Sequence, residues 1–324
     1  MAVRVGFVGV GGIAGAHINV LSKMEGVKLV AFCDTASERA EAAAAAHGGK
    51  AYRDHHDLLR EQKLDALYVC TPPFAHTDAE IIAAKKGIHL FVEKPIALTL
   101  AKALEIRDAV EKAGVASSAG YHFRYFETTA MARKLARRQK IGMMLGYWMG
   151  GMPGVHWWRV MKESGGQFHE QTTHIFDLAR YFAGDVKTVY AAAATRALQE
   201  VPDFDITDVG TATVEFKSGI VATINNTCIL GGGVRGVVGL HLVCKDLLLE
   251  LGFDTLRVVQ GNREETIRGT RDCRVAQNEA FIKAVRDGDR SGILSDYADA
   301  VKSLAVSLAA NQSIATGQAV KVKA

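Results

Sequence analysis

A chain of 324 residues is long enough for two domains, because single hydrophobic cores stop growing near about 250 to 300 residues. The 39 lysines and arginines against 35 aspartates and glutamates leave a formal charge of +4, which is too slight to indicate a nucleic-acid partner. Five scattered cysteines without a CxxC pair argue against a zinc ribbon or a disulfide framework and favour reduced thiols in the cytoplasm. No apolar run is long enough to predict a membrane span or a secretory leader.

The first predicted elements are a strand, a glycine-rich turn and a helix. Apolar residues over 3–8 predict the strand, and apolar residues recur at helical intervals from Ile18 onward. Between them lies a GxGxxA spacing that starts at Gly9, in which glycines permit a tight turn and let the backbone approach a pyrophosphate. By itself the motif is weak, and a plain tight turn explains it as well. The candidate cofactor-binding residues of this turn are Gly9, Gly11, Gly12 and Ile13.

A second predicted strand, over 27–34, ends in a carboxylate. Asp34 lies 23 residues beyond Gly11, where a carboxylate accepts hydrogen bonds from the ribose hydroxyls of a dinucleotide and repels a 2′-phosphate. The position therefore favours NAD over NADP as the cofactor. NADP stays open, since Arg39 just beyond the strand could accommodate the extra phosphate.

The alternation of strand and helix continues to about residue 119. Such alternation predicts a parallel sheet with helices on both faces. Thr71 and Pro72 follow a strand end and are expected to line the cofactor site together with His76, although a histidine bound to a local partner is an equal explanation. The predicted helices follow Ser37, pass through Ile81 and span 99–113, and the predicted strands span 67–70, 90–92 and 115–119.

The run Glu93-Lys94-Pro95 follows the strand over 90–92. A buried strand has no use for a charged pair at its carboxyl end, whereas ligands bind at that end in open α/β sheets. Proline keeps Lys94 out of the helical region, so its side chain projects from the strand end. Lys94 is therefore the first catalytic candidate, and a surface ion pair is the alternative.

The pattern changes after Tyr121. A helix over 126–140 and a strand over 145–149 lead into a glycine-rich loop that carries His156, Trp157, Trp158 and Arg159. Two adjacent tryptophans on an extended chain cannot both face one core. One is expected to pack and the other to border a ligand, with core filling the simpler explanation for either.

Glycines at 165–166 precede a helix that carries His169, Glu170, His174 and Asp177. A zinc-protease interpretation fails, because His169 and His174 are separated by about 140° around a helix. No metal site is predicted. Glu170 and His174 share a helix face, as do His174 and Asp177, and a carboxylate beside an imidazole orients the ring and raises its basicity. A structural, hydrogen-bonded histidine explains the spacing equally well.

Strands dominate from about residue 207. They predict an antiparallel meander covered on one face by helices, which leaves the other face for self-association. The chain is thus predicted to be α/β, with a dinucleotide-binding domain over 1–122 and a substrate-binding and oligomerisation domain over 123–324, whose C-terminal helix can pack back on the first domain. The predicted strands span 212–216, 220–225, 237–243 and 247–251, and the helices 281–288 and 297–314.

Together these residues resemble the glucose-fructose oxidoreductase and inositol dehydrogenase family (Gfo/Idh/MocA) of NAD(P)-dependent enzymes. The resemblance implies an N-terminal Rossmann domain with a doubly wound parallel sheet, and a C-terminal α/β domain with an open, mostly antiparallel sheet that builds a homodimer or homotetramer. It implies a dehydrogenase acting on CH-OH groups of sugars, sugar derivatives or cyclitols. The motifs that carry it are Gly9 to Gly15, Cys70-Thr71-Pro72-Pro73 with His76, Glu93-Lys94-Pro95, and Gly165-Gly166 before Glu170, His174 and Asp177.

The matching positions imply Lys94 and His174 as the catalytic pair, with Glu170 where the family usually has aspartate. His174 would take the hydroxyl proton while a hydride passes to the nicotinamide, and Lys94 would hold the same oxygen. A cis Lys94-Pro95 bond is also implied. The cofactor-binding candidates are Gly9, Gly11, Gly12, Ile13, Asp34, Thr71, Pro72, His76, Glu93 and Lys94, and the substrate-binding candidates are Tyr121, Arg124, His156, Arg159 and Asp177.

Two other functions stay open at this point. Some relatives use NAD to hydrolyse glycosides through a transient oxidation, for which Lys94 and His174 would also serve. A third class is a sensor or regulator that keeps the nucleotide fold without turnover.

Overall fold

The computed structural model describes residues 2–323, which fold as two compact units. The first unit comprises Met1–His122 and Cys273–Val301, and the second comprises Phe123–Asp272 and Lys302–Ala324. The sequence places 273–301 in the second domain, whereas the structure groups this segment with the first unit. The reason is apolar packing, because Phe281 and Ile282 are buried in the core of the first unit.

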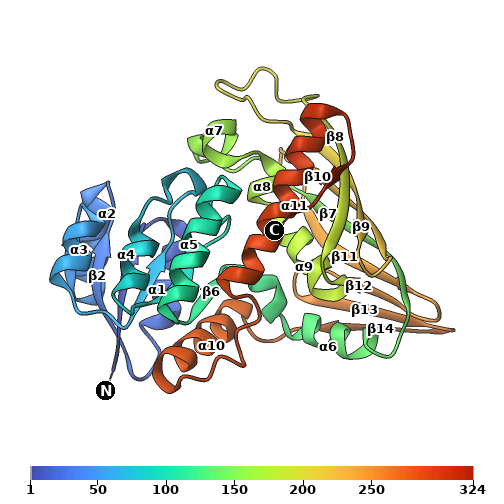
Figure 1. Cartoon of the computed structure of the whole chain (residues 1–324). Coiled ribbons are helices and arrows are strands. Elements are labelled where there is room, and N and C mark those ends of the chain that lie inside the picture. The colour runs from blue at the N-terminus through green and yellow to red at the C-terminus, as the bar shows by residue number, and fades with distance from the viewer. Residues whose placement is uncertain (1, 324) are drawn as a thin grey trace. The chain divides into compact units, whose positions relative to one another are not determined.

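A six-stranded parallel sheet forms the centre of the first unit (Figure 1). The strand order is β3-β2-β1-β4-β5-β6, so the order reverses between β1 and β4, where open α/β sheets bind their ligands. Its central strands are apolar throughout because helices cover both faces. The strands are β1 (Val3–Val8), β2 (Val27–Cys33), β3 (Lys50–Tyr52), β4 (Ala66–Val69), β5 (His89–Val92) and β6 (Ser117–Ala119).

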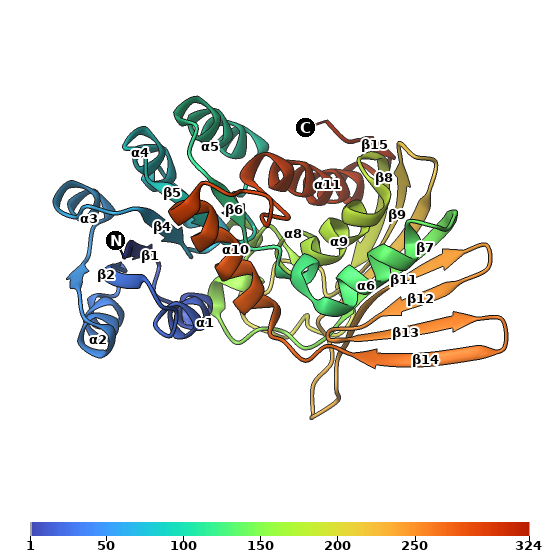
Figure 2. The same ribbon diagram turned by 90° about the horizontal axis from the view of Figure 1, so that it is seen from below.

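Helices α1, α2 and α10 cover one face of this sheet and α3, α4 and α5 cover the other (Figure 2). Aromatic rings fill the core between them: Tyr68 stacks on Phe7 and Phe91 with centroids 5.0 and 4.6 Å apart. The helices are α1 (Gly12–Leu21), α2 (Ser37–His47), α3 (His55–Glu61), α4 (Ala79–Lys85), α5 (Leu100–Ala113) and α10 (Cys273–Asp287), with a 3₁₀ turn η1 (Pro73–Ala75).

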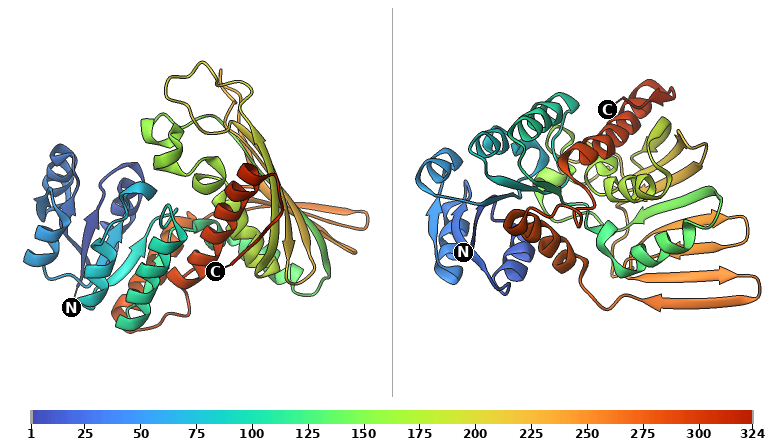
Figure 3. Two further views of the ribbon diagram at one scale, coloured as in Figure 1. Left: turned by 45° about the horizontal axis from the view of Figure 1, so that its top comes forward. Right: turned by 60° about the horizontal axis from the view of Figure 1, so that its bottom comes forward.

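A nine-stranded, mostly antiparallel sheet forms the second unit, and with it the predicted fold class is confirmed (Figure 3). The order is β14-β13-β12-β11-β7-β10-β9-β8-β15. The predicted simple meander is wrong, because β7 inserts between β10 and β11 and pairs with β10 in parallel. The strands are β7 (Ile141–Met149), β8 (Val186–Ala194), β9 (Val209–Phe216), β10 (Val221–Thr227), β11 (Val237–Cys244), β12 (Leu248–Leu251), β13 (Thr255–Gln260), β14 (Arg263–Arg268) and β15 (Val320–Lys321).

The helices of the second unit pack on one face of this sheet, with α9 against β7 and β11 and α6 against β12 and β13. The opposite face carries half-buried side chains, among them Leu145, His241 and Leu248. No helix within residues 2–323 is long and apolar enough to cross a membrane. The remaining helical segments are η2 (His122–Tyr125), α6 (Glu127–Ala136), η3 (His156–Arg159), α7 (Met161–Ser164), α8 (Gln167–Glu170), α9 (Thr173–Ala183) and α11 (Tyr297–Thr316). The boundary between the two units falls within α11, after Val301.

Candidate functional site

In the glycine turn between β1 and α1, the backbone of Gly9 lies close to the backbone of Cys70. Gly9 has φ +84°, and a Cβ there would lie 2.7 Å from the carbonyl of Cys70, so only glycine fits. At Gly11 and Gly12, by contrast, a Cβ would meet nothing within 4 Å. Helix α1 also begins without a capping side chain or an acidic residue in its first turn. The first amides of α1 are therefore available to an anion such as a pyrophosphate.

Asp34 at the end of β2 ties this turn to the sheet. Its Oδ2 accepts a hydrogen bond from the Val10 amide at 2.8 Å and its Oδ1 accepts one from the Ala36 amide at 2.9 Å. Each carboxylate oxygen has a further lone pair, which can accept from a ribose hydroxyl. Arg39 is 63% exposed, with Nη1 4.0 Å from Asp34 Oδ1. The residues present thus fit a dinucleotide at this strand end.

The segment after β4 carries the next candidates, Thr71, Pro72 and His76. The imidazole of His76 lies with Nδ1 2.5 Å from Glu80 Oε1, and both side chains are completely buried. His76 therefore has the local hydrogen-bond partner that the alternative explanation requires. Three atoms here lack a hydrogen-bond partner within the described part of the chain: Thr71 Oγ1, His76 Nε2 and Glu80 Oε2.

Glu93 and Lys94 follow β5, the next strand of the sheet. Glu93 is 3% exposed, its Oε1 lies 2.9 Å from His17 Nε2, and its Oε2 accepts a hydrogen bond from the Lys94 amide at 3.0 Å. Burial alone would raise the pKa of the Glu93 carboxyl, but the hydrogen bond from His17 and nearby positive charge outweigh it and lower the pKa. The Lys94-Pro95 bond is cis, which confirms the expectation from the resemblance.

Tyr121 and His122 complete the first unit near this strand end. Tyr121 is 1% exposed and His122 is also buried. Burial lowers the pKa of His122 to about 4, helped by the charges of Arg274 and Lys94 and opposed by Glu93. His122 is therefore neutral at physiological pH.

His174 lies in the second unit, in the first turn of α9. It is 3% exposed, and its ring is nearly parallel to those of Phe123 and Trp148, with centroids 4.7 and 5.8 Å away. An aromatic wall therefore sets the plane of the imidazole.

The continuous helix predicted through Glu170 and His174 is wrong, because the structure divides this segment into two helices. Helix α8 ends at Glu170 and α9 begins at Thr173, and between them the Thr172 amide bonds to Gln167 O, five residues back. Glu170 Oε2 accepts a hydrogen bond from Trp158 Nε1 at 2.7 Å. An orienting role of Glu170 toward His174 stays a prediction.

Arg124 and Asp177, two candidates for substrate binding, bind each other in the structure. The guanidinium of Arg124 donates to both carboxylate oxygens of Asp177 at 2.7 and 2.5 Å, and Ser303 Oγ donates to the same carboxylate at 2.7 Å. Asp177 is 0% and Arg124 4% exposed. This geometry is that of a bidentate buried ion pair, whose loss would leave an uncompensated charge.

The loop after β7 carries the remaining candidates. His156 is exposed, with Nε2 3.1 Å from Asp203 Oδ2. Arg159 is half-buried, and its Nε finds no partner among residues 2–323. Trp158 is 1% exposed and packs in a small apolar cluster, against which the half-buried Trp157 also packs. Both tryptophans thus contribute to one core, contrary to the expectation for an extended chain, because they lie in the 3₁₀ turn η3.

Sequence reasoning missed the residues that support Glu93. His17 lies on the buried face of α1 with Ala14 and Ile18, where an apolar residue is usual, and that position is the signal that could have found it. Asn278 is separated from His17 by 261 residues, and no local pattern connects them.

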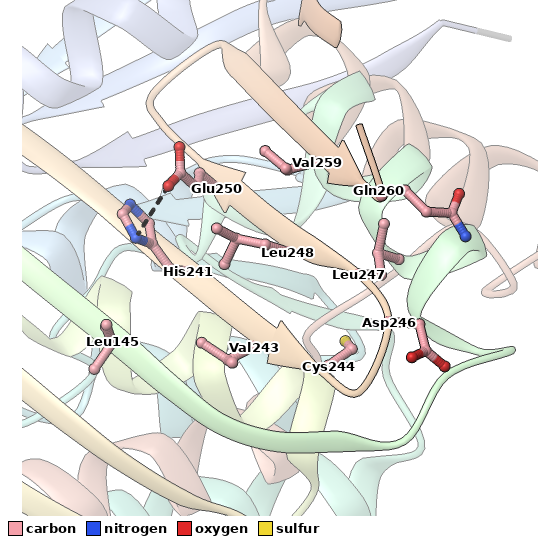
Figure 4. Close-up of a pocket in the computed structure, with 11 residues that line it drawn as sticks. Leu145, His241, Val243, Cys244, Asp246, Leu247, Leu248, Glu250, Val259 and Gln260 are labelled. Carbon is pink, nitrogen blue, oxygen red and sulfur yellow. Dashed lines mark ion pairs between the residues drawn. The ribbon is translucent and has the colours of Figure 1, made fainter. Parts of the chain in front are cut away.

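Two other features lie away from the predicted residues. Asp54, His55 and His56 have potential metal-ligand atoms within 4.8 Å of one another, but their side chains bond to each other and to Asp78. A hollow of about 760 Å³ lies on the open face of the large sheet (Figure 4), and no predicted site residue lines it.

Comparison with known proteins matches both halves of the chain. Residues 3–121 match the model of the GFO/IDH/MocA oxidoreductase family, with its NAD-binding Rossmann fold, and residues 130–242 match the GFO/IDH/MocA C-terminal domain. The myo-inositol 2-dehydrogenase of Thermotoga maritima is 27% identical over 99% of this chain and 98% of its own length. The scyllo-inositol 2-dehydrogenase (NAD(+)) of Bacillus subtilis is also 27% identical, over 99% of this chain and 96% of its own.

Solved structures share the fold over the whole chain. The WlbA dehydrogenase from Bordetella pertussis, in complex with NADH and UDP-GlcNAcA, matches with a TM-score of 0.88 at 22% identity, covering 100% of this chain and 98% of its own. Levoglucosan dehydrogenase in complex with NADH matches with a TM-score of 0.89 at 20% identity, covering 100% of both chains.

Proposed function

Because the chain belongs to the Gfo/Idh/MocA oxidoreductase family, we propose that it is an NAD-dependent dehydrogenase that transfers a hydride between nicotinamide and a sugar, sugar derivative or cyclitol. The observation that carries the proposal is the strand-end geometry of the first unit. There the bare turn at Gly11 and Gly12, the carboxylate of Asp34, and the Glu93-Lys94-Pro95 run all follow carboxyl ends of strands in one parallel sheet. The inositol dehydrogenases among the relatives support a polyol as substrate.

The cofactor would be held by the chain's own backbone and one carboxylate. The amides of Gly11, Gly12 and Ile13 would bind the pyrophosphate at the start of α1, and Asp34 would accept hydrogen bonds from the ribose. Thr71, Pro72 and His76 would line the same site. When bound, NAD supplies the hydride acceptor. The carboxylate of Asp34 supports NAD over NADP.

Two side chains, Lys94 and His174, would handle the developing charge and the proton. Lys94 would donate a hydrogen bond to the reacting oxygen and stabilise negative charge on it. His174, held flat against Phe123 and Trp148, would accept the hydroxyl proton on a ring nitrogen. Glu170 would help to orient that ring, and Tyr121, Arg124, His156, Arg159 and Asp177 remain the proposed substrate contacts.

A panel of sugars, cyclitols and glycosides tests the proposal, with NAD and NADP run in parallel. We expect NADH absorbance to rise with at least one free sugar or cyclitol. Cleavage of a glycoside without net NADH would instead indicate an NAD-dependent hydrolase. Binding of NAD without turnover of any member of the panel would indicate a sensor.

We also propose that the protein works as a homodimer or homotetramer in the cytoplasm. The hollow on the open sheet face is lined by apolar Leu145, Val243, Leu248 and Val259 and, at one side, by the His241–Glu250 ion pair at 3.9 Å (Figure 4). A hollowed apolar face that also carries a polar pair suits contact with a second copy. All five cysteines are free and buried, which supports a reducing compartment.

A further inference from the structure

Four buried polar side chains form one line that ends at the backbone of Lys94. They come from separate elements of the first unit: Tyr68 from β4, Asn278 from α10, His17 from α1 and Glu93 from the end of β5. Tyr68 and Asn278 are 0% exposed, His17 is 1% and Glu93 is 3% exposed. Polar groups so deeply buried are costly unless each one is hydrogen-bonded.

The three side-chain hydrogen bonds of this line all run toward Glu93. Tyr68 donates its hydroxyl proton to Asn278 Oδ1 at 2.8 Å, so the oxygen of the amide faces the tyrosine. Asn278 Nδ2 then donates to Arg274 O at 2.8 Å and to His17 Nδ1 at 2.9 Å. The opposite pairing, of His17 Nδ1 with Asn278 Oδ1, is longer at 3.2 Å. Since Nδ1 accepts, the ring carries its proton on Nε2.

The far end of the line reaches the peptide of Lys94. His17 Nε2 donates to Glu93 Oε1 at 2.9 Å, and Glu93 Oε2 accepts from the Lys94 amide at 3.0 Å. Both ring nitrogens of His17 and both carboxylate oxygens of Glu93 thereby have partners. Against the effect of burial, the hydrogen bond from His17 and nearby charge lower the pKa of the Glu93 carboxyl, which favours its ionised form.

The carboxylate of Glu93 lies in a closely packed environment. A Cβ at Gly120 would lie 2.3 Å from Glu93 Oε2, so the neighbouring strand end leaves room for the carboxylate only because it carries glycine there. On the other side, the ring of His17 packs edge-on against Phe91 with centroids 4.7 Å apart. Both Glu93 and His17 are therefore closely packed against these neighbours.

We propose that His17 is a positioning residue for Lys94 and acts through Glu93. Asn278 sets the tautomer of the His17 ring. This inference rests on the proposed function in one respect, that Lys94 acts on the substrate. The line anchors the amide of Lys94, and therefore the point from which its side chain leaves the strand end. A displacement of about 1 Å at a reacting group can cost ~10²-fold in rate, so a side chain that never touches the substrate can control turnover.

Two substitutions at His17 distinguish the effect of losing its hydrogen bond to Glu93 from the effect of changing the size of the side chain. His17→Leu keeps the size of the side chain but removes the donor, and His17→Gln can present an N–H toward Glu93. We expect kcat to fall by about 10- to 100-fold in His17→Leu with KM and the Kd for NAD little changed, and His17→Gln to recover most of the loss. His89→Gln is the matched control, because His89 lies at the opposite, amino end of β5, where its Nδ1 accepts from the Ala116 amide.

Hydrogen exchange at the Lys94 amide reports on the same line without any turnover. We expect exchange at Lys94 to accelerate by about tenfold or more in His17→Leu and to be unchanged in His89→Gln. Unchanged exchange at Lys94 in His17→Leu would overturn the inference. Accelerated exchange in a protein that oxidises no polyol would refute the proposed function while the anchoring of Lys94 stands.

A milder variant covers the case in which His17→Leu does not fold. Tyr68→Phe removes only the hydroxyl that orients Asn278, and NMR of ¹⁵N-labelled histidine reads the tautomer of His17 directly. We expect the proton of His17 on Nε2 in the wild-type protein, and a mixture of tautomers in Tyr68→Phe. A wild-type proton on Nδ1 would contradict the direction of the line and end the inference.

Discussion

At the scale of single residues, the expected chemistry depends first on Lys94. Lys94→Ala removes the ammonium that would stabilise charge on the reacting oxygen, so we expect kcat to fall by about 10²- to 10⁴-fold while the Kd for NAD changes little. Steady-state kinetics and calorimetric titration with NAD measure the two effects. Lys102→Ala is the control, because Lys102 pairs only with Glu105 on the surface of α5 in the described structure. Unaltered turnover in Lys94→Ala would remove Lys94 from the mechanism.

A second prediction at this scale concerns acid stability and follows from His122. Its folded pKa of about 4 is below the ordinary value of 6.5, so the unfolded chain takes up a proton below pH 6.5 and the folded protein does not until about pH 4. The contribution of His122 to the free energy of unfolding is therefore fully present above pH 6.5. It is lost as the pH falls toward 4, and the loss from this group is up to ~3 kcal/mol. Denaturant unfolding of the wild type and of His122→Phe across this range measures it. Parallel losses in the two proteins would show that His122 is not responsible.

At the scale of elements, the turn between β1 and α1 offers a matched pair of glycines. Gly9→Ala must shift the backbone of Cys70, at a positive φ, and we expect it to destabilise the fold by ~1–3 kcal/mol and to weaken NAD binding. Gly15→Ala adds a methyl to α1 where nothing lies within 4 Å, and should stabilise the helix by up to ~1 kcal/mol. Thermal unfolding and NAD titration compare them. Equal effects at the two positions would argue against a special turn at Gly9.

Element boundaries also show where local patterns fail. The sequence predicts one helix through Glu170 and His174, yet the helix is interrupted at Gln171 and Thr172. There Thr172 Oγ1 accepts a hydrogen bond from Asn226 on β10. A tertiary contact thus lies where the helix is interrupted. Strand β8 was missed because its run of alanines has no strand preference of its own, and it forms by pairing with β9.

At the scale of the whole molecule, the open face of the large sheet predicts assembly. Leu248→Arg places a charge in the hollow beside Val243 and Val259, so we expect light scattering to show a smaller species than in the wild type. Val234→Arg makes the same kind of change at a 62% exposed loop position and should leave the mass unaltered. A wild-type protein that is monomeric at working concentration would refute assembly through this face.

Features that depend on near neighbours along the chain could be predicted from the sequence. The Gly9 turn, the strand before Lys94, the cis bond to Pro95 and the fold class were predicted from spacings of a few residues, from their order along the chain and from the resemblance that they carry. Only the tertiary structure decided that residues 273–301 belong to the first unit and that Asn278, His17 and Glu93 form one line. The physical reason is that a buried polar atom takes whichever partner the packing brings to it, and partners 261 residues apart leave no periodic signal in the sequence.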